Sequence, residues 1–366
     1  MTSTVPEQLI SQIRPAIRGR SPYIVGGDSQ APDVKLNQNE SPFDLPEDLK
    51  KEILESFLDI PFNRYPREHP YDLIRALSDT LNHPPEGILV GNGSNELTYT
   101  IGLCLINPGA PVVLPTPMFS LYKKVILLYD GIPISIAPKP DLHVDLDALH
   151  EAIGLHSPSL TIITTPNNPT GLSVPFDAIE SLLKESPGFL LVDEAYVEFT
   201  SQRSALALMD QYPNLLILRT FSKAFGLAGM RIGYLLGHPS VIQELLKSRL
   251  PFVVDPLAET VALALMRKPE IIASRVQEII EERDALINAL KKLPDVKVIP
   301  SDANFLLLKT PVAPAILMKK LTRNGVLVRN MEGYPELAGY LRVNAGSKDE
   351  NKVFLRALED TMYSNS

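Results

Sequence analysis

The chain has 366 residues and a formal net charge of −8, with 45% hydrophobic and 21% charged residues. Its length allows one large domain or two lobes around a cleft, and its composition is ordinary for a soluble globular protein. Because the charge is spread along the chain without a basic block, nucleic acid and anionic membrane surfaces are poor candidate partners.

The cysteine content indicates a reducing compartment, and the spacing of the histidines indicates no metal site. The single cysteine, Cys104, excludes an intrachain disulfide. No apolar run is long enough to span a bilayer, and the N-terminal residues lack the basic and apolar regions of a secretory signal, so we expect a soluble cytoplasmic protein. The histidines lack the spacing of metal ligands; they are His69, His83, His143, His150, His156 and His238.

The first 44 residues are predicted to form an N-terminal arm. A short amphipathic helix precedes an irregular stretch rich in proline and glycine, which ends in KLNQNESPFDLP (35–46). From residue 86 onward the pattern becomes strand, turn and helix, repeated. We therefore place a large domain at residues 45–255.

Five strand-and-turn segments build this predicted domain. They are EGILVGNGSNELTYTIGLCL (86–105), APVVLPTPMFSLYKKVI (110–126), SLTIITTPNNPTG (159–171), GFLLVDEAYVEF (188–199) and NLLILRTFSKAFG (214–226). The last three strands begin about thirty residues apart, the length of a βαβ unit. Their continuous apolar runs are typical of a parallel sheet buried on both faces. MRIGYLLG (230–237) leaves no room for a crossover, so we expect an antiparallel edge strand there.

The remaining residues, 256–366, are predicted to form a smaller α+β domain that packs with part of the arm. A long amphipathic helix over 269–293 leads into it. Strands are expected within 295–310, 325–331 and 339–346, with a helix over 313–323 and another at the C-terminus. We find neither repeats nor low-complexity tracts.

Polar residues follow the predicted parallel strands. In open α/β sheets, ligands bind outside the carboxyl ends of the strands, so these residues should face one crevice. The five sets lie at 91–96, 117–119, 167–168, 193–196 and 220–223.

This set of side chains matches the functional groups of pyridoxal phosphate. A lysine in a partly apolar cleft, such as Lys223, has a lowered pKa and can attack a carbonyl. Asp193 could hold a pyridinium nitrogen, while a tyrosine and an asparagine could bind a phenolate oxygen. The turn at a helix N-terminus after residue 91, together with Thr220, Ser222 and Arg231, offers donors for a phosphate. No nucleotide-binding fingerprint competes with this interpretation.

Each residue alone also has a plain structural explanation. Lys223 alone could be a surface lysine, and Asp193 could cap a helix. NNPTG (167–171) is a good turn, and isolated arginines mostly form surface ion pairs. The joint placement at strand ends favours the functional interpretation over all of these.

Four motifs resemble those of the fold-type I, aspartate aminotransferase-like enzymes. They are NNPTG (167–171), VDEAY (192–196), SKAFGLAGMRIGY (222–234) and LRVNAG (341–346). The resemblance covers nearly the whole chain, and the motifs occur in order and at suitable spacing, so their combination is specific. The resemblance implies an α/β fold: a large domain with a mostly parallel seven-stranded sheet flanked by helices, and a smaller α+β domain.

Within that group, further segments resemble the histidinol-phosphate aminotransferase family. They are LNQNESPFD (36–44), NRYP (63–66) and VRNM (328–331), and the overall length agrees. The resemblance implies a homodimer that uses pyridoxal 5′-phosphate. It implies transfer of the amino group of L-histidinol phosphate to 2-oxoglutarate, giving imidazole-acetol phosphate and L-glutamate, in histidine biosynthesis.

The resemblance also implies roles for the catalytic and ring-binding residues. Lys223 matches the lysine that attaches the cofactor and later moves the proton. Asp193 matches the acid that pairs with the pyridine nitrogen. Tyr196 and Asn168 match the partners of the ring oxygen, and Phe119 falls where an aromatic residue stacks on the ring.

The phosphate and substrate contacts are implied in the same way. The phosphate cup matches Ser94, Asn95, Thr220, Ser222 and Arg231. Tyr65 resembles a tyrosine that reaches the cofactor phosphate from the other subunit. Arg342 matches the arginine that binds the substrate carboxylate, and Arg329 resembles a second arginine for the phosphate of histidinol phosphate. Asn39 and Tyr23 lie where the arm closes over substrate, although SPYIVGGDS matches the family's pattern around Tyr23 only loosely.

Three alternatives stay open from the sequence. The chain could be an aromatic or broad-specificity amino-acid aminotransferase, or a threonine-phosphate decarboxylase of the same fold. It could also be a catalytically silent binding module, against which the intact Lys223, Asp193 and Arg231 argue.

Overall fold

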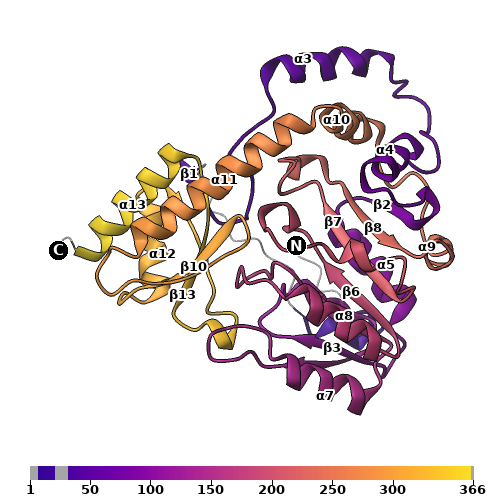
Figure 1. Cartoon of the computed structure of the whole chain (residues 1–366), viewed down its shortest axis with the longest axis horizontal. Coiled ribbons are helices and arrows are strands. Elements are labelled where there is room, and N and C mark those ends of the chain that lie inside the picture. The colour runs from indigo at the N-terminus through magenta and orange to yellow at the C-terminus, as the bar shows by residue number, and fades with distance from the viewer. Residues whose placement is uncertain (1–6, 21–31, 364–366) are drawn as a thin grey trace.

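The structure is a computed structural model that describes residues 7–20 and 32–363. A seven-stranded and a four-stranded β-sheet lie beside each other, and the long helix α11 (Pro269–Leu290) runs from the larger sheet's helices to the smaller sheet (Figure 1). Within the described ranges, no helix is long and apolar enough to cross a membrane. The same ranges hold no cluster of three histidine, cysteine or carboxylate side chains that could bind a metal.

The larger sheet has seven strands in the order β2-β8-β7-β6-β5-β3-β4. The strands are β2 (Ile88–Gly91), β3 (Pro111–Pro115), β4 (Ile132–Ile136), β5 (Leu160–Thr164), β6 (Phe189–Asp193), β7 (Leu215–Thr220) and β8 (Gly233–Gly237). β8 runs antiparallel to both of its neighbours, β7 and β2, and all other neighbouring strands pair in parallel. The mostly parallel seven-stranded sheet is therefore confirmed.

The prediction that residues 230–237 form an edge strand is wrong, although the antiparallel direction is correct. β8 pairs with β7 on one side and with β2 on the other. All five of its residues are buried, which an edge strand would not achieve. The short connection from β7 explains the direction, but the free edge of β8 is covered by a strand from much earlier in the chain.

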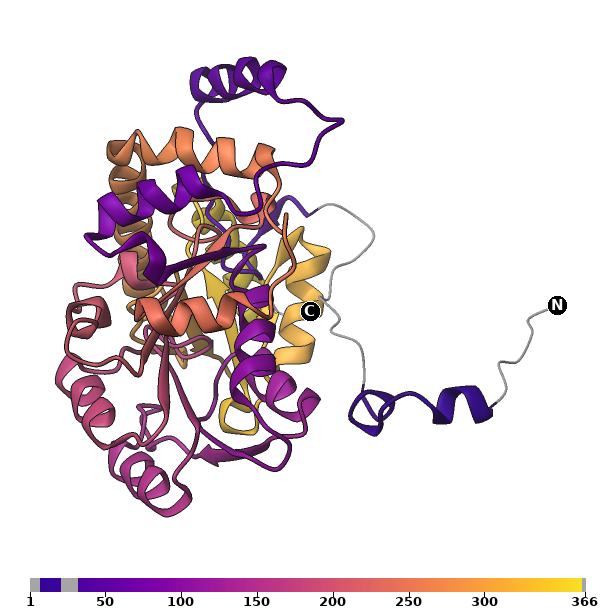
Figure 2. The same cartoon turned by 90° about the vertical axis from the view of Figure 1, so that its right-hand side faces the viewer.

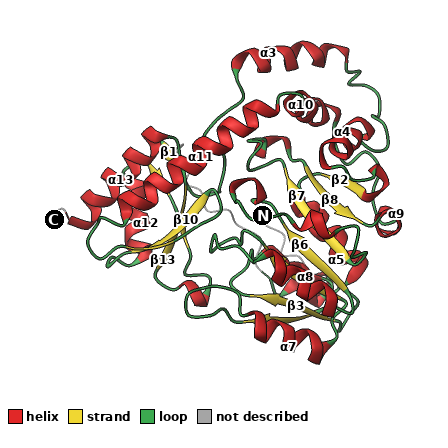
Figure 3. Ribbon diagram, viewed as in Figure 1, coloured by secondary structure: helices red, strands yellow, loops and turns green. Residues whose placement is uncertain are grey.

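Helices cover both faces of the larger sheet (Figure 3). Those that contribute to the two cores are α3 (Glu47–Ser56), α4 (Tyr71–Leu81), α5 (Ser94–Leu105), α6 (Leu121–Leu128), α7 (Leu146–His156), α8 (Phe176–Glu185), α9 (Pro239–Leu246) and α10 (Pro256–Met266). Along β7, Ile217 packs into one core, with α4, α7, α8 and α10, whereas Leu216 and Leu218 pack into the other, with α5, α6 and α9. The apolar run is continuous because alternate residues face opposite, equally buried sides.

The smaller sheet is antiparallel, with the order β12-β13-β10-β9. Its strands are β9 (Lys297–Ile299), β10 (Phe305–Lys309), β12 (Arg329–Asn330) and β13 (Tyr340–Asn344). The arm joins this part through β1 (Val34–Lys35), which pairs with β11 (Val326–Leu327). The helices here are α12 (Pro314–Arg323), as predicted, and α13 (Lys348–Tyr363).

The beginning of the arm forms two short helices instead of the single one predicted. They are α1 (Glu7–Ser11) and α2 (Pro15–Arg18). Pro15 explains the break, because proline disfavours a helical conformation at the preceding residue, and Arg14 is extended with φ −48° and ψ 135°. Short 3₁₀ segments complete the fold: η1 (Phe57–Asp59), η2 (Pro85–Gly87), η3 (Val197–Phe199), η4 (Ala205–Leu208), η5 (Ala228–Met230) and η6 (Pro335–Leu337).

The predicted domain limits at residues 44 and 255 stay a prediction. α10, which the sequence interpretation places in the smaller domain, packs against α3 and α4 beside the larger sheet. Its residues Ala258 and Val261 belong to that sheet's core.

Candidate active site

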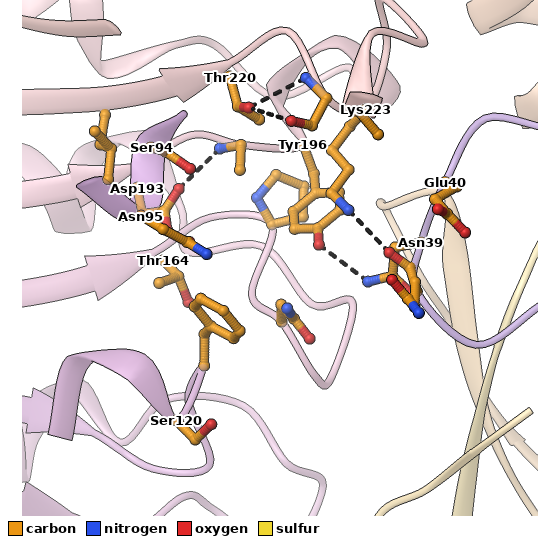
Figure 4. A pocket seen from close by; sticks show the side chains of 18 of the residues that line it. Asn39, Glu40, Ser94, Asn95, Ser120, Thr164, Asp193, Tyr196, Thr220 and Lys223 are labelled. Carbon is orange, nitrogen blue, oxygen red and sulfur yellow. Dashed lines mark hydrogen bonds between the residues drawn. The ribbon is translucent and has the colours of Figure 1, made fainter. Parts of the chain in front are cut away.

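A cavity of about 500 Å³ lies where β5, β6 and β7 end, bounded on the other side by the arm and the smaller sheet. Figure 4 shows residues from both sides pointing into it. The predicted site residues that line it are Asn39, Ser94, Asn95, Phe119, Asn168, Asp193, Tyr196, Thr220, Ser222, Lys223, Arg231, Arg329 and Arg342. The expected convergence at the strand ends is thus present in the fold.

Lys223 stands in the loop directly after β7. Its Nζ donates a hydrogen bond to the backbone oxygen of Gln38 at 2.9 Å and lies 5.9 Å from the ring centre of Tyr196. Burial lowers the pKa of this amine to about 7, and the nearby charge of Arg342 adds to the effect. The neutral amine, which is the nucleophilic form, is therefore accessible near neutral pH.

Asp193 ends β6 and is held by two neutral donors. Its Oδ2 accepts a hydrogen bond from the Tyr122 hydroxyl at 2.6 Å, and its Oδ1 accepts one from the Ala195 backbone N–H at 3.0 Å. Burial raises the pKa of Asp193 to about 6, and the two hydrogen bonds limit the rise. The carboxylate is mostly ionised at pH 7 and keeps free lone pairs for a further donor.

An anion-binding cup lies at the beginning of α5. Gly93 is the N-cap, and no side chain caps the helix, which leaves backbone N–H groups available. Arg231 donates to Ser222 Oγ at 3.3 Å, and Thr220 Oγ1 lies 3.0 Å from the same oxygen. Gly93 has φ +79°, and a Cβ there would sit 2.5 Å from Arg231 Nη2, so only glycine keeps this close approach. The donors and the charge suit a phosphate group.

The middle of the cavity suits a flat aromatic ring. The Tyr196 hydroxyl accepts a hydrogen bond from Asn39 Nδ2 at 3.0 Å. Phe119 also lines the cavity and packs edge-on against Tyr122, with ring centres 6.4 Å apart. Asn168 accepts a hydrogen bond from Arg342.

Two arginines face each other on the wall formed by the smaller sheet. Arg329 on β12 and Arg342 on β13 are direct cross-strand partners, and both line the cavity. Arg342 is anchored by Asn168 Oδ1 at 2.5 Å and by the backbone oxygen of Asn37 at 3.0 Å. Like charges placed opposite each other destabilise a strand pair, so this arrangement favours an anionic ligand between or above them.

One predicted residue, Tyr65, does not line the cavity. Tyr65 is 84% exposed and stacks on Phe252, with ring centres 4.9 Å apart. Tyr23 lies outside the described residues.

Several lining residues were not found from the sequence. The clearest is Tyr122 in the first turn of α6, whose hydroxyl lies 2.6 Å from Asp193 Oδ2. Glu40, which forms an ion pair with Lys35 at 2.7 Å, and Tyr334 also line the cavity. Their positions depend on how the arm and the loop after β12 fold back, for which the sequence offers no local signal.

Comparisons with known proteins identify relatives over nearly the whole chain. Residues 31–358 match the family model described as aminotransferase class I and II. Histidinol-phosphate aminotransferase of Chlorobium phaeovibrioides is 42% identical over 350 residues, which cover 96% of this chain and 97% of the relative. The enzyme of the same name from Chlorobaculum tepidum is 41% identical over 95% of this chain and 99% of its own length.

Solved structures with the same fold confirm the fold class. Histidinol-phosphate aminotransferase from Sinorhizobium meliloti, in complex with pyridoxal-5′-phosphate, superimposes with a TM-score of 0.87 at 24% identity, over 97% of this chain and 98% of that one. L-threonine-O-3-phosphate decarboxylase from Porphyromonas gingivalis gives a TM-score of 0.78, also at 24% identity, over 89% and 98% of the two chains. Because both enzymes share the fold, the fold alone does not distinguish their activities.

Proposed function

The chain belongs to the class I and II aminotransferases, and we propose that it transfers the amino group of L-histidinol phosphate to 2-oxoglutarate. The products are imidazole-acetol phosphate and L-glutamate, a step of histidine biosynthesis. The observation that carries this proposal is the cross-strand pair Arg329 and Arg342 in the same cavity as a buried lysine. The relatives that are about 40% identical over almost the full length support the same substrate.

Pyridoxal 5′-phosphate is the cofactor in this proposal. It supplies an aldehyde for the amine and a ring that withdraws electrons from the reacting carbon. The residues described above fit it: Lys223 would hold the aldehyde carbon, Asp193 the ring nitrogen and Tyr196 the ring oxygen. Phe119 would pack on the ring, and the cup at the start of α5 would hold the phosphate.

The same side chains would carry the proton and bind the substrates. Lys223 Nζ, with a pKa of about 7, can both accept and return a proton near neutral pH. Arg342 would bind the carboxylate of glutamate, and Arg329 the phosphate of histidinol phosphate. Asn39 would hold the Tyr196 hydroxyl in place from the arm.

A homodimer with shared sites is part of the proposal. Helix α3 and the segment after it stand away from the two sheets (Figure 2). The segment carries large apolar side chains with high exposure: Leu58 at 86%, Phe62 at 78% and Tyr65 at 84%. Clustered exposed apolar residues mark an interaction surface, and Tyr65 would reach the partner's phosphate cup. A single-chain mass in sedimentation velocity at micromolar concentration would contradict this.

A cytoplasmic location completes the proposal. Cys104 is exposed and is the single cysteine of the chain, which suits a reducing compartment. Secretion of the native protein into the medium or periplasm would argue against it.

The substrate is tested by steady-state kinetics with three amino donors. Histidinol phosphate, phenylalanine and tyrosine are compared, each with 2-oxoglutarate as acceptor. The proposal requires the highest kcat/KM for histidinol phosphate, while a higher value for either aromatic amino acid would identify an aromatic aminotransferase. Release of carbon dioxide from threonine phosphate would identify the decarboxylase instead.

Arg329→Ala should separate the two substrates. Losing a hydrogen-bonded charge contact is worth about 1.5–3 kcal/mol, so kcat/KM for histidinol phosphate should fall roughly 10- to 150-fold. The value for glutamate should change by less than about threefold, because Arg342 remains. Arg323→Ala, an exposed arginine at the end of α12, serves as the matched control. Equal losses for both substrates would refute this division between the two arginines.

A further inference from the structure

Tyr122 is a buried residue in the first turn of α6. It is 2% exposed and lines the cavity. Its hydroxyl donates a 2.6 Å hydrogen bond to Oδ2 of Asp193, which is 71 residues later in the sequence. The bond therefore joins a helix on one face of the larger sheet to the end of its central strand β6.

The hydrogen bond offsets the cost of burying Asp193. A buried carboxylate prefers its neutral form, and burial raises the pKa of Asp193 to about 6. Among the effects that lower this pKa, the Tyr122 hydrogen bond is the largest, followed by the Ala195 N–H. Tyr122 thus contributes most to keeping the carboxylate charged near neutral pH.

Tyr122 itself is a reliable donor. Burial, and next the charge of Asp193, raise the pKa of its hydroxyl well above the ordinary value of 10. The phenol therefore keeps its proton over the whole physiological range, so the bond always has the same direction, from tyrosine to aspartate.

The geometry also fixes where Asp193 points. Tyr122 occupies one acceptor position on Oδ2, and Ala195 N–H occupies one on Oδ1. Each carboxylate oxygen has a second lone pair, which remains for a donor from the cavity. The Tyr122 ring packs edge-on against Phe119, which lines the same cavity. One side chain thus supports both the expected ring-stacking residue and the expected partner of the ring nitrogen.

We propose that Tyr122 is a positioning residue that keeps Asp193 ionised and directed at the ring nitrogen of the cofactor. This inference rests on the proposed function, because it assumes that pyridoxal 5′-phosphate occupies the cavity. Tyr122 acts through Asp193 and exchanges no proton with the substrate.

Tyr122→Phe tests the inference through cofactor affinity. The apoprotein is titrated with pyridoxal 5′-phosphate between pH 5 and 9, and binding is followed by absorbance. Without the hydroxyl, the pKa of Asp193 rises further, so the pH below which affinity falls should move up by about one unit or more. With a one-unit rise, binding should be roughly twofold weaker at pH 7 and approach about tenfold weaker at pH 5. An unchanged pH profile would overturn the proposal.

Two further sets of variants separate positioning from packing. Tyr212→Phe removes a comparable tyrosine–carboxylate bond, to Glu180 at 3.0 Å, away from the cavity, and should leave the profile unchanged. In an Asp193→Asn background, Tyr122→Phe should have no additional effect on affinity, because an amide carries no charge to stabilise. The same loss in both backgrounds would show a packing role and refute the proposal. Tyr122→His keeps a ring N–H donor, and its profile should lie closer to wild type than that of Tyr122→Phe.

The outcomes also distinguish this inference from the proposed function. If the wild-type protein binds the cofactor but does not use histidinol phosphate, the substrate proposal fails and the role of Tyr122 stands. If Tyr122→Phe binds the cofactor as the wild type does at every pH, the role of Tyr122 fails and the substrate proposal stands.

Discussion

Lys223→Ala should abolish turnover and covalent attachment of the cofactor. Nothing else in the part of the chain that the structure describes places a buried amine with a pKa near 7 at the end of β7. Alanine removes both the nucleophile and the group that moves the proton, so kcat should fall by at least about 10⁴-fold. The cavity would keep its cup for the phosphate and its aromatic wall, so weak noncovalent binding of the cofactor should remain.

The measurement combines absorbance with borohydride reduction. Wild-type protein should show the visible band of the attached cofactor, and reduction should fix the cofactor to the chain permanently. The variant should show neither. Lys247→Ala, which removes an exposed lysine paired with Glu244, is the control and should behave as wild type. A Lys223→Ala variant with turnover near that of the wild type would refute the assignment of the site.

The strand ends of the larger sheet could be predicted because their signals are local. In β5, β6 and β7, an apolar run is followed directly by polar residues, and about thirty residues separate the strands. The position of β8 could not be derived in this way. Whether a strand lies at an edge depends on which distant segment pairs with it, and the partner here, β2, lies more than a hundred residues earlier.

The site residues differ in the same way: those in local motifs could be predicted, whereas those whose contacts depend on the fold could not. Lys223, Asp193 and the phosphate cup lie in recognisable motifs, and the fold brings them into one cavity. The cross-strand position of Arg329 and Arg342 depends on the register of two antiparallel strands, which the separate motifs do not specify. Tyr122 was missed because a tyrosine in an apolar helix is usually a core residue; only the fold brings its hydroxyl to Asp193.

A buried ion pair beside the site joins the end of β6 to β7, and removing one of its two partners should be strongly destabilising. Arg219 Nη2 lies 2.7 Å from Glu194 Oε2, and the two side chains are 9% and 1% exposed. The other oxygen of Glu194 accepts the Ala205 backbone N–H at 2.7 Å and the Ser204 hydroxyl at 3.0 Å. Asp193 precedes Glu194, and Thr220 follows Arg219, so the pair fixes the strand ends that carry the site.

Arg219→Met should lower the free energy of unfolding by about 3–5 kcal/mol, because it leaves the Glu194 charge buried without its partner. This loss of unfolding free energy should be larger at high pH than at low pH. Burial already raises the pKa of the neighbouring Glu198 to about 7, and the charge of Arg219 opposes that rise. A buried carboxyl whose pKa lies above its unfolded value costs nothing while protonated in both states, and costs progressively more as pH rises from its unfolded value through its folded one.

Urea unfolding at pH 5 and pH 8 measures how far Arg219→Met lowers the free energy of unfolding and whether that loss grows with pH. Lys352→Met, which breaks an exposed pair with Asp349, should leave the free energy of unfolding nearly unchanged at either pH. The double variant Arg219→Met with Glu194→Gln should recover much of the loss, since it no longer buries the Glu194 charge. If Arg219→Met proved no more destabilising than Lys352→Met, the pair would contribute little, and the packing of β6 against β7 would alone hold the catalytic strand ends in place.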